Sequence, residues 1–229
     1  MFLLVMPRWA SVRWAEHQPW KRLGLRKRDQ SHKDNRLASF CGGVLIAKGL
    51  LAFIVCLLCF KGWGHWQGMS NLNDLMNALA LSIGVGLAEE LIFRAWLWSE
   101  LTLLWGPIAG LFGQAGLFSL VHTRFNLGFA AMGGLLTGLL LLGLVLALLR
   151  RMQRGSLWGC VGLHGGLVGG WFLLQNGLLE VSAQTPAWLV GPGGIHANPL
   201  GSLVGIAGLS FTLSIQCLLL SKRRQCSNP

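Results

Sequence analysis

The side chains of this protein that can do acid–base chemistry stand inside stretches that are otherwise apolar. Glu89 and Glu90 are adjacent, Arg94 follows Glu90 by four residues, and His122 and His164 occur in two later apolar stretches. Ionisable groups are costly in such surroundings, so they indicate a functional site. One carboxylate and two imidazoles are enough to position and deprotonate a water molecule for attack on a carbonyl carbon. The same groups can instead bind a metal ion, which makes bound water more acidic.

The two adjacent glutamates are expected to have different roles. On an α-helix, Glu90 and Arg94 lie on one face and can form a buried ion pair, whereas Glu89 points about 100° away. Taken singly, each residue has a commoner structural explanation, either as a hydrogen-bonded packing histidine or as half of a Glu–Arg clamp. The combination on three separate segments favours a site formed by Glu89, His122 and His164, which are the candidate catalytic residues and also the candidate metal ligands.

The composition is that of a membrane protein. The chain has 229 residues, of which 53% are hydrophobic and 12% charged, and its mean hydropathy is +0.55. Its 32 glycines and lack of tyrosine suit close helix packing. The net charge of +11 comes from basic clusters beside apolar runs, which indicates membrane topology and contact with lipid rather than nucleic acid. We predict an all-α fold, a polytopic membrane bundle of about six transmembrane helices.

The apolar segments divide the chain into a leader, a transmembrane domain and a tail. The predicted spans are residues 39–60, 74–105, 108–122, 127–149, 156–176 and 199–220. The second span is longer than a bilayer requires, so it should be tilted or broken, and Pro107 opens the third. Residues 1–38 form a basic leader, residues 39–220 the transmembrane domain and residues 221–229 a basic tail. With both termini cytoplasmic, the basic clusters at 21–36, 150–154 and 222–224 all satisfy the positive-inside rule.

The three candidate catalytic residues are expected at similar depths in the membrane. Counted from the predicted cytoplasmic helix ends, Glu89 lies ~24 Å deep and His122 ~22 Å deep. His164 lies ~21 Å deep if its helix starts near Arg150, but only ~12 Å deep if it starts at Ser156. The three side chains lie at one depth if the helix starts near Arg150. If it starts at Ser156, helix tilt must make up the difference in depth.

The order and spacing of these residues resemble a known family. Glu89-Glu90-x-x-x-Arg94 is followed by Phe118-x-x-x-His122, and then by an Arg-Gly-Ser-Leu-Trp motif at residues 154–158 that precedes His164. This pattern, over residues 79–176, is similar to the CPBP family, which comprises the bacterial relatives of type II CAAX prenyl endopeptidases, of the Abi or lysostaphin-resistance type. The resemblance implies an intramembrane protease in a bacterial plasma membrane or other internal membrane. It implies cleavage of a membrane-associated protein or peptide more strongly than it implies CAAX processing.

The resemblance also implies a role for each residue. Glu89 is expected to be the general base, with His122 and His164 positioning the water or, in the metalloprotease description of the family, binding a divalent metal such as zinc. Glu90 and Arg94 are the expected supporting pair. The family often has asparagine four residues after the last histidine, where this chain has Val168. An oxyanion would then need other donors, such as Arg94 or the backbone at residues 165–166.

Two other classes of function remain open, whereas other intramembrane proteases fit poorly. The chain has no His-Glu-x-x-His and no Gly-x-Ser-Gly motif, and Asp29, Asp34 and Asp74 fall outside the span interiors. The main alternative is a non-catalytic membrane scaffold or transporter-like assembly factor with a structural Glu–Arg–His network. A second alternative is a lipid- or partner-binding module that acts through the basic leader.

Overall fold

The structure is a computed structural model that describes residues 2–26, 35–191 and 198–225. Residues 27–34 of the predicted leader and 226–229 of the predicted tail lie outside this range. Most of the described chain is helical, which confirms the predicted all-α class. The elements are α1 (Phe2–Arg13), α2 (Pro19–Arg22), α3 (Arg36–Phe60), β1 (Gly64–Trp66), α4 (Leu72–Glu89), η1 (Glu90–Leu97), α5 (Trp98–His122), α6 (Phe129–Met152), α7 (Trp158–Leu173), η2 (Leu174–Leu178), β2 (Leu179–Val181), α8 (Ala187–Val190), η4 (Pro199–Gly201) and α9 (Leu203–Gln225).

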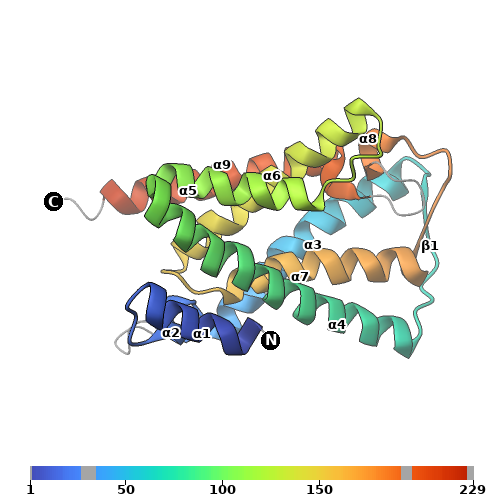
Figure 1. Ribbon diagram of the computed structural model, residues 1–229. Helices are drawn as coiled ribbons and strands as arrows, with labels where there is room; N and C mark the ends of the chain where they lie inside the picture. The colour runs from blue at the N-terminus through green and yellow to red at the C-terminus, as the bar shows by residue number, and fades with distance from the viewer. Residues whose placement is uncertain (1, 27–34, 192–197, 226–229) are drawn as a thin grey trace.

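The long helices form two layers (Figure 1). In one layer α7 packs between α3 and α4, and in the other α6 packs between α5 and α9. One hydrophobic core joins the layers, with Leu51 of α3, Phe118 of α5, Leu142 of α6 and Leu163 of α7 among its members. Side chains from both layers therefore meet in the middle of the bundle, where the candidate site lies.

Helix α5 consists of two arms rather than one rod. Gly106 has φ 83° and ψ 172°, a conformation that glycine adopts without strain, and Pro107 follows it. A Cβ atom on Gly110 would lie 2.7 Å from Thr102 Oγ1, so the arms before and after Gly106 lie against each other. The chain reverses direction here (Figure 1), at the predicted boundary between the spans 74–105 and 108–122.

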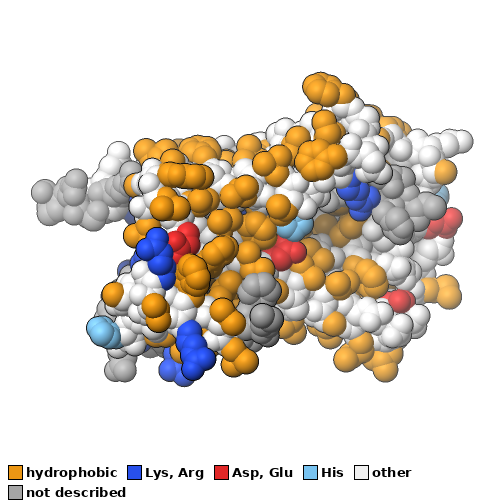
Figure 2. All heavy atoms as spheres, in the orientation of Figure 1, with side chains coloured by type: hydrophobic (Ala, Val, Ile, Leu, Met, Phe, Trp, Pro, Cys, Tyr) orange, Lys and Arg blue, Asp and Glu red, His pale blue; other side chains and the backbone are white. Residues whose placement is uncertain are grey.

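Four helical segments are long and apolar enough to cross a membrane: Arg36–Phe60, Leu72–His122, Phe129–Met152 and Leu203–Arg223. The second is a run of 51 residues that contains the reversal at Gly106, so it includes two of the predicted spans. The fifth predicted span corresponds to α7, which has 16 residues and continues as the π-helix η2. Hydrophobic side chains cover much of the face in Figure 2, as expected of a surface that contacts lipid.

A short β-ribbon, which the sequence did not predict, ties the ends of two helices together. Strand β1 follows α3 and pairs antiparallel with β2, which follows η2, with Gly64 opposite Val181 and Trp66 opposite Leu179. Each strand has three residues, too few for an alternating pattern to be recognised. The strands lie in the connections that follow the predicted spans 39–60 and 156–176, and so the ribbon fixes the ends of α3 and α7 to each other.

Glycines allow α7 to approach its neighbours at backbone distance. A Cβ atom on Gly165 would overlap the carbonyl oxygen of Ser82 in α4, and one on Gly162 would overlap the carbonyl oxygen of Phe40 in α3. Such close contact is typical of helix pairs in membranes, where small residues let backbones meet. The approach brings His164, which adjoins Gly165, toward the end of α4.

Replacing Gly165 by alanine is expected to lower the free energy of unfolding by about 1–3 kcal/mol, because the added methyl group has no space. Thermal unfolding of the detergent-solubilised protein measures the effect. Gly116→Ala is the matched control, since nothing lies within 4 Å of a Cβ atom at that position. A destabilisation of the same size in both variants would show that close α4–α7 contact is not the cause.

The N-terminal segment is anchored to the bundle through Glu100. Trp9 Nε1 and Trp14 Nε1 donate hydrogen bonds of 2.8 and 2.7 Å to Glu100 Oε1, and Arg13 Nε lies 3.5 Å from Oε2. Glu100 is only 9% exposed, so its carboxylate is largely shielded from solvent by these donors. The described part of the predicted leader thus packs on the bundle, with Leu23 buried beneath it.

Replacing Glu100 by alanine is expected to release this segment. Each hydrogen bond to a charged acceptor contributes about 1.5–3 kcal/mol, so amide hydrogen exchange in residues 2–26 should accelerate at least about tenfold. Mass spectrometry of the exchanged protein measures this, with Glu180→Ala, a change at an exposed carboxylate on β2, as the control. Unchanged exchange in the Glu100 variant would contradict the anchoring role.

Candidate active site

The two glutamates stand at the junction of an α-helix and a π-helix and have different surroundings. Helix α4 ends at Glu89, and the π-helix η1 begins at Glu90 and continues to Leu97. Segments of π-helix are rare and frequently occur at functional sites. The Glu89 side chain is 24% exposed, whereas those of Glu90 and Arg94 are fully buried. The predicted division into one available and one enclosed carboxylate is therefore present in the geometry.

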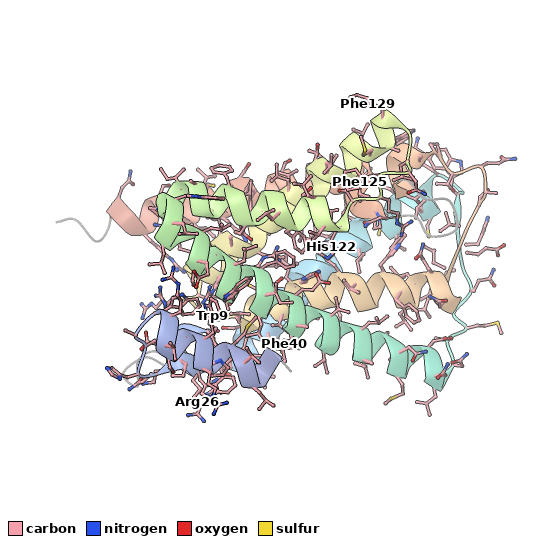
Figure 3. The ribbon with its side chains drawn as sticks, viewed as in Figure 1. Trp9, Arg26, Phe40, His122, Phe125 and Phe129 are labelled. Carbon is pink, nitrogen blue, oxygen red and sulfur yellow. The ribbon has the colours of Figure 1, made fainter. Side chains whose placement is uncertain are left out.

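His122 is the last residue of α5, and Phe118 orients it in two ways. His122 Nδ1 lies 2.8 Å from the carbonyl oxygen of Phe118, which can only accept, so we assign the proton to Nδ1. The two rings also stack, with centroids 4.4 Å apart and planes at 38°. Figure 3 shows His122 at the end of α5, on the side that faces α4 and α7. Its Nε2 atom is thus left to face the site.

His164 reaches the same place from α7. Its Nδ1 atom lies 2.9 Å from Glu90 Oε1, and because a carboxylate oxygen accepts, Nδ1 donates here as well. The side chain is only 5% exposed. Helix α7 begins at Trp158, close to Ser156, the less favourable of the two starts considered from the sequence, yet His164 Nε2 lies 3.7 Å from Glu89 Oε2.

Both imidazoles direct their remaining nitrogen to one carboxylate oxygen. Glu89 Oε2 lies 3.0 Å from His122 Nε2 and 3.7 Å from His164 Nε2. At 3.0 Å a proton carried by either the carboxylate or the imidazole can pass between them. The pair can therefore accept a proton from one group and deliver it to another without help from bulk solvent. The three candidate catalytic residues are brought together, as predicted.

Arg94 forms an ion pair with Glu90 on the buried side of the site. Its Nη1 atom lies 3.0 Å from Glu90 Oε1, the oxygen that also accepts from His164. The guanidinium carbon lies 4.1 Å from the centroid of the Phe118 ring, a cation–π arrangement. Arg150 Nη1 donates to the carbonyl oxygen of Arg94 and so holds its backbone. Arg94 is fully enclosed by these partners, which removes it from the oxyanion donors considered from the sequence.

The catalytic candidates open into a cavity of about 450 Å³ between the two layers. Most of its wall is apolar and comes from α3, α6 and α7, and Val168 is part of it. Three polar side chains that the sequence analysis did not single out, Arg124, Gln175 and Asn198, also line it. Arg124 and Asn198 lie in connections between helices and Gln175 lies in η2, and at none of these places does a polar residue carry a distinguishing signal in a single sequence. An apolar pocket with a few polar groups is typical of a substrate site.

The donor types at the site suit a metal ion. Two imidazoles and a carboxylate are common zinc ligands, and each imidazole has its other nitrogen held by an oxygen, as in many metal sites. Within residues 2–26, 35–191 and 198–225, however, no three His, Cys, Asp or Glu side chains are grouped so that they hold a metal ion. The carboxylate and the imidazoles can activate water by themselves, and a divalent metal held by the same residues would instead make the bound water more acidic.

Comparison with known proteins finds one family model that matches part of the chain. Residues 71–169 match the family described as type II CAAX prenyl endopeptidase, Rce1-like. This range contains Glu89, His122 and His164, together with the enclosed pair Glu90 and Arg94. No curated protein and no solved structure matches the chain. The match confirms the resemblance predicted from the sequence.

Proposed function

We propose that this integral membrane protein is an endopeptidase that cuts a membrane-associated protein or peptide, because residues 71–169 match the Rce1-like type II CAAX prenyl endopeptidase family. The observation that supports it most directly is the convergence of His122 and His164 on Glu89, at 3.0 and 3.7 Å. The proposal places both termini in the cytoplasm, as the basic clusters favour, and requires no prenyl group on the substrate.

In the proposed reaction Glu89 is the general base. Its carboxylate takes a proton from a water molecule while the water oxygen attacks the carbonyl carbon of the scissile peptide bond. The Nε2 lone pair of His164 accepts the second water hydrogen and fixes the direction of attack. The proton held between Glu89 and His122 then passes to the leaving nitrogen as the carbon–nitrogen bond breaks. The products are one carboxylic acid and one amine.

We propose that Asn198 donates a hydrogen bond to the oxyanion. It would take the place of the asparagine that the family often has where this chain has Val168. Its Oδ1 atom accepts from the backbone nitrogen of Leu200 at 3.1 Å, which fixes the side chain and leaves the NH₂ group as donor. The turn after it is held against α6, where a Cβ atom on Gly138 would overlap the carbonyl oxygen of Leu200. Asn198 and Val168 line the same cavity.

Asn198→Ala is expected to lower kcat by about 10²–10³-fold, the usual loss for one oxyanion donor. The double variant Asn198→Ala/Val168→Asn is expected to recover part of that loss, because it returns an amide to the cavity from α7. Steady-state cleavage of one peptide by the wild type and the two variants measures both effects. Full activity in Asn198→Ala would remove Asn198 from the mechanism.

The proposed function is tested by incubating the purified full-length protein with a library of membrane-tethered peptides in proteoliposomes, with and without a chelator. Cleavage that survives the chelator and is lost in His122→Ala and His164→Ala supports water activation by Glu89 and the imidazoles. Cleavage lost with the chelator would assign the reaction to a metal held by the same residues. No cleavage by a folded wild type would favour the scaffold alternative.

A further inference from the structure

A second cavity, of about 560 Å³, lies at the end of the bundle where the chain reverses at Gly106. Its wall comes from α2, from both arms of α5, from the end of α6 and from the turn after α6. It shares no lining residue with the cavity that contains Glu89. Its lining residues other than Arg22 lie within the matched range 71–169, but the proposed reaction uses none of them.

Four arginines line this second cavity: Arg22, Arg150, Arg151 and Arg154. Among the described residues no Asp or Glu side chain lines it. Guanidinium groups gathered around one space repel one another, and an anion between them removes that repulsion. Arginine also presents its donors in a fixed fork that matches phosphate oxygens. The charge and shape of the wall therefore favour a phosphate group as the occupant.

The arginines are held on a rigid frame rather than on a free loop. Arg150 is buried, and its Nε and Nη2 atoms donate to the carbonyl oxygens of Gly155 and Arg22 at 3.2 and 3.1 Å. The turn that follows α6 is thereby fixed, with Arg154 in the left-handed conformation at φ 54°. Arg151 and Arg154 are exposed, so their head groups are accessible to a ligand.

The rest of the wall is apolar and adjoins the lipid-facing surface. Pro107, Leu111 and Leu148 line the cavity, and the neighbouring Trp105 and Ile108 are 61% and 73% exposed. A tryptophan exposed beside a cluster of arginines is typical of the level of lipid headgroups. A ligand that carries a phosphate and a hydrocarbon chain satisfies both parts of the wall, and basic pockets between membrane helices bind such headgroups.

We propose that this arginine cavity binds the phosphate group of an anionic phospholipid. The charged head lies among the arginines, and the acyl chains leave along α5 past Trp105. Free phosphate has the same head-group chemistry but lacks the chains, so the two sources can be separated by experiment. The proposal concerns binding alone and does not depend on proteolysis.

The test is a binding titration of the full-length protein in an uncharged detergent, at low salt, with short-chain phosphatidylglycerol, short-chain phosphatidylcholine and inorganic phosphate as probes. The variants are Arg151→Gln and Arg154→Asn, the latter because asparagine tolerates a positive φ. Arg8→Gln is the matched control, since Arg8 is an exposed arginine of α1 outside the cavity. Thermal unfolding without ligand verifies that all the variants fold.

The wild type should bind phosphatidylglycerol more tightly than phosphatidylcholine, and each cavity variant should weaken it about fivefold, whereas Arg8→Gln should not. Displacement of the lipid by an equal concentration of inorganic phosphate, with the same dependence on Arg151 and Arg154, would support the phosphate site and assign it to the free anion. Equal binding by all four proteins, or an equal loss in Arg8→Gln, would overturn the proposal.

Discussion

Replacing Glu89 by glutamine is expected to lower peptide-bond cleavage by about 10²–10⁴-fold, the usual contribution of a general base. The substitution keeps the size and shape of the side chain, and a glutamine amide can still donate to His122 Nε2, which lies 3.0 Å from Glu89 Oε2. Unfolding of the variant should therefore match that of the wild type. Cleavage of a membrane-tethered peptide and thermal unfolding, measured on the same preparations, separate the two effects.

Glu180→Gln is the matched control for this experiment. Glu180 lies on β2, is exposed, accepts a hydrogen bond from Gln67 and does not line the cavity that contains Glu89. It should retain full activity. If Glu89→Gln kept the activity of the wild type, Glu89 would not be the base. If it lost both activity and folding, its role would be structural.

Replacing Arg94 by methionine is expected to destabilise the protein by about 3–5 kcal/mol, the usual cost of breaking a buried ion pair by removing one partner. Arg94 and Glu90 are fully buried, and their charged atoms lie 3.0 Å apart. Without the guanidinium group, Glu90 would keep only His164 Nδ1–H at 2.9 Å as a charge-stabilising donor. Thermal or denaturant unfolding in detergent measures the loss.

The double variant Glu90→Gln/Arg94→Met gives this experiment its control. It removes the uncompensated charge, while the glutamine oxygen can still accept from His164, so it should recover most of the lost stability. The ion-pair account would be contradicted if the stability lost in the double variant equalled the sum of the losses in Glu90→Gln and Arg94→Met measured separately. Packing around each side chain would then dominate. The recovered stability also shows whether the Glu90–Arg94 pair acts as one unit.

The parts of the fold that follow from hydrophobic pattern could be predicted from the sequence. Helix content, the reversal near Pro107 and the enclosed position of Arg94 beside Glu90 all rest on the lengths of apolar runs and on the cost of burying a charge. The residue types around Glu89 likewise limited the chemistry to acid–base or metal catalysis. Each of these features depends on local sequence alone.

The parts that depend on tertiary packing could not be predicted. The π-helix η1 and the β-ribbon leave no periodic signal, because both are short. Asn198 reaches the cavity only because its turn packs on α6. Glu100 lies within the predicted span 74–105, but its partners Trp9 and Trp14 lie about ninety positions earlier, and spacing cannot reveal a contact over such a distance.

The most direct test of the central claim, that Glu89, His122 and His164 act together on one water molecule, is a comparison of single and combined variants. Cleavage rates of one membrane-tethered peptide are measured for the wild type, for Glu89→Gln, His122→Ala and His164→Ala, and for the triple variant. Residues that act as a unit lose activity in a strongly non-additive way, so the triple variant should be about as slow as Glu89→Gln. Losses that multiply across the three sites, or a wild type that cuts no faster than the triple variant, would contradict the claim.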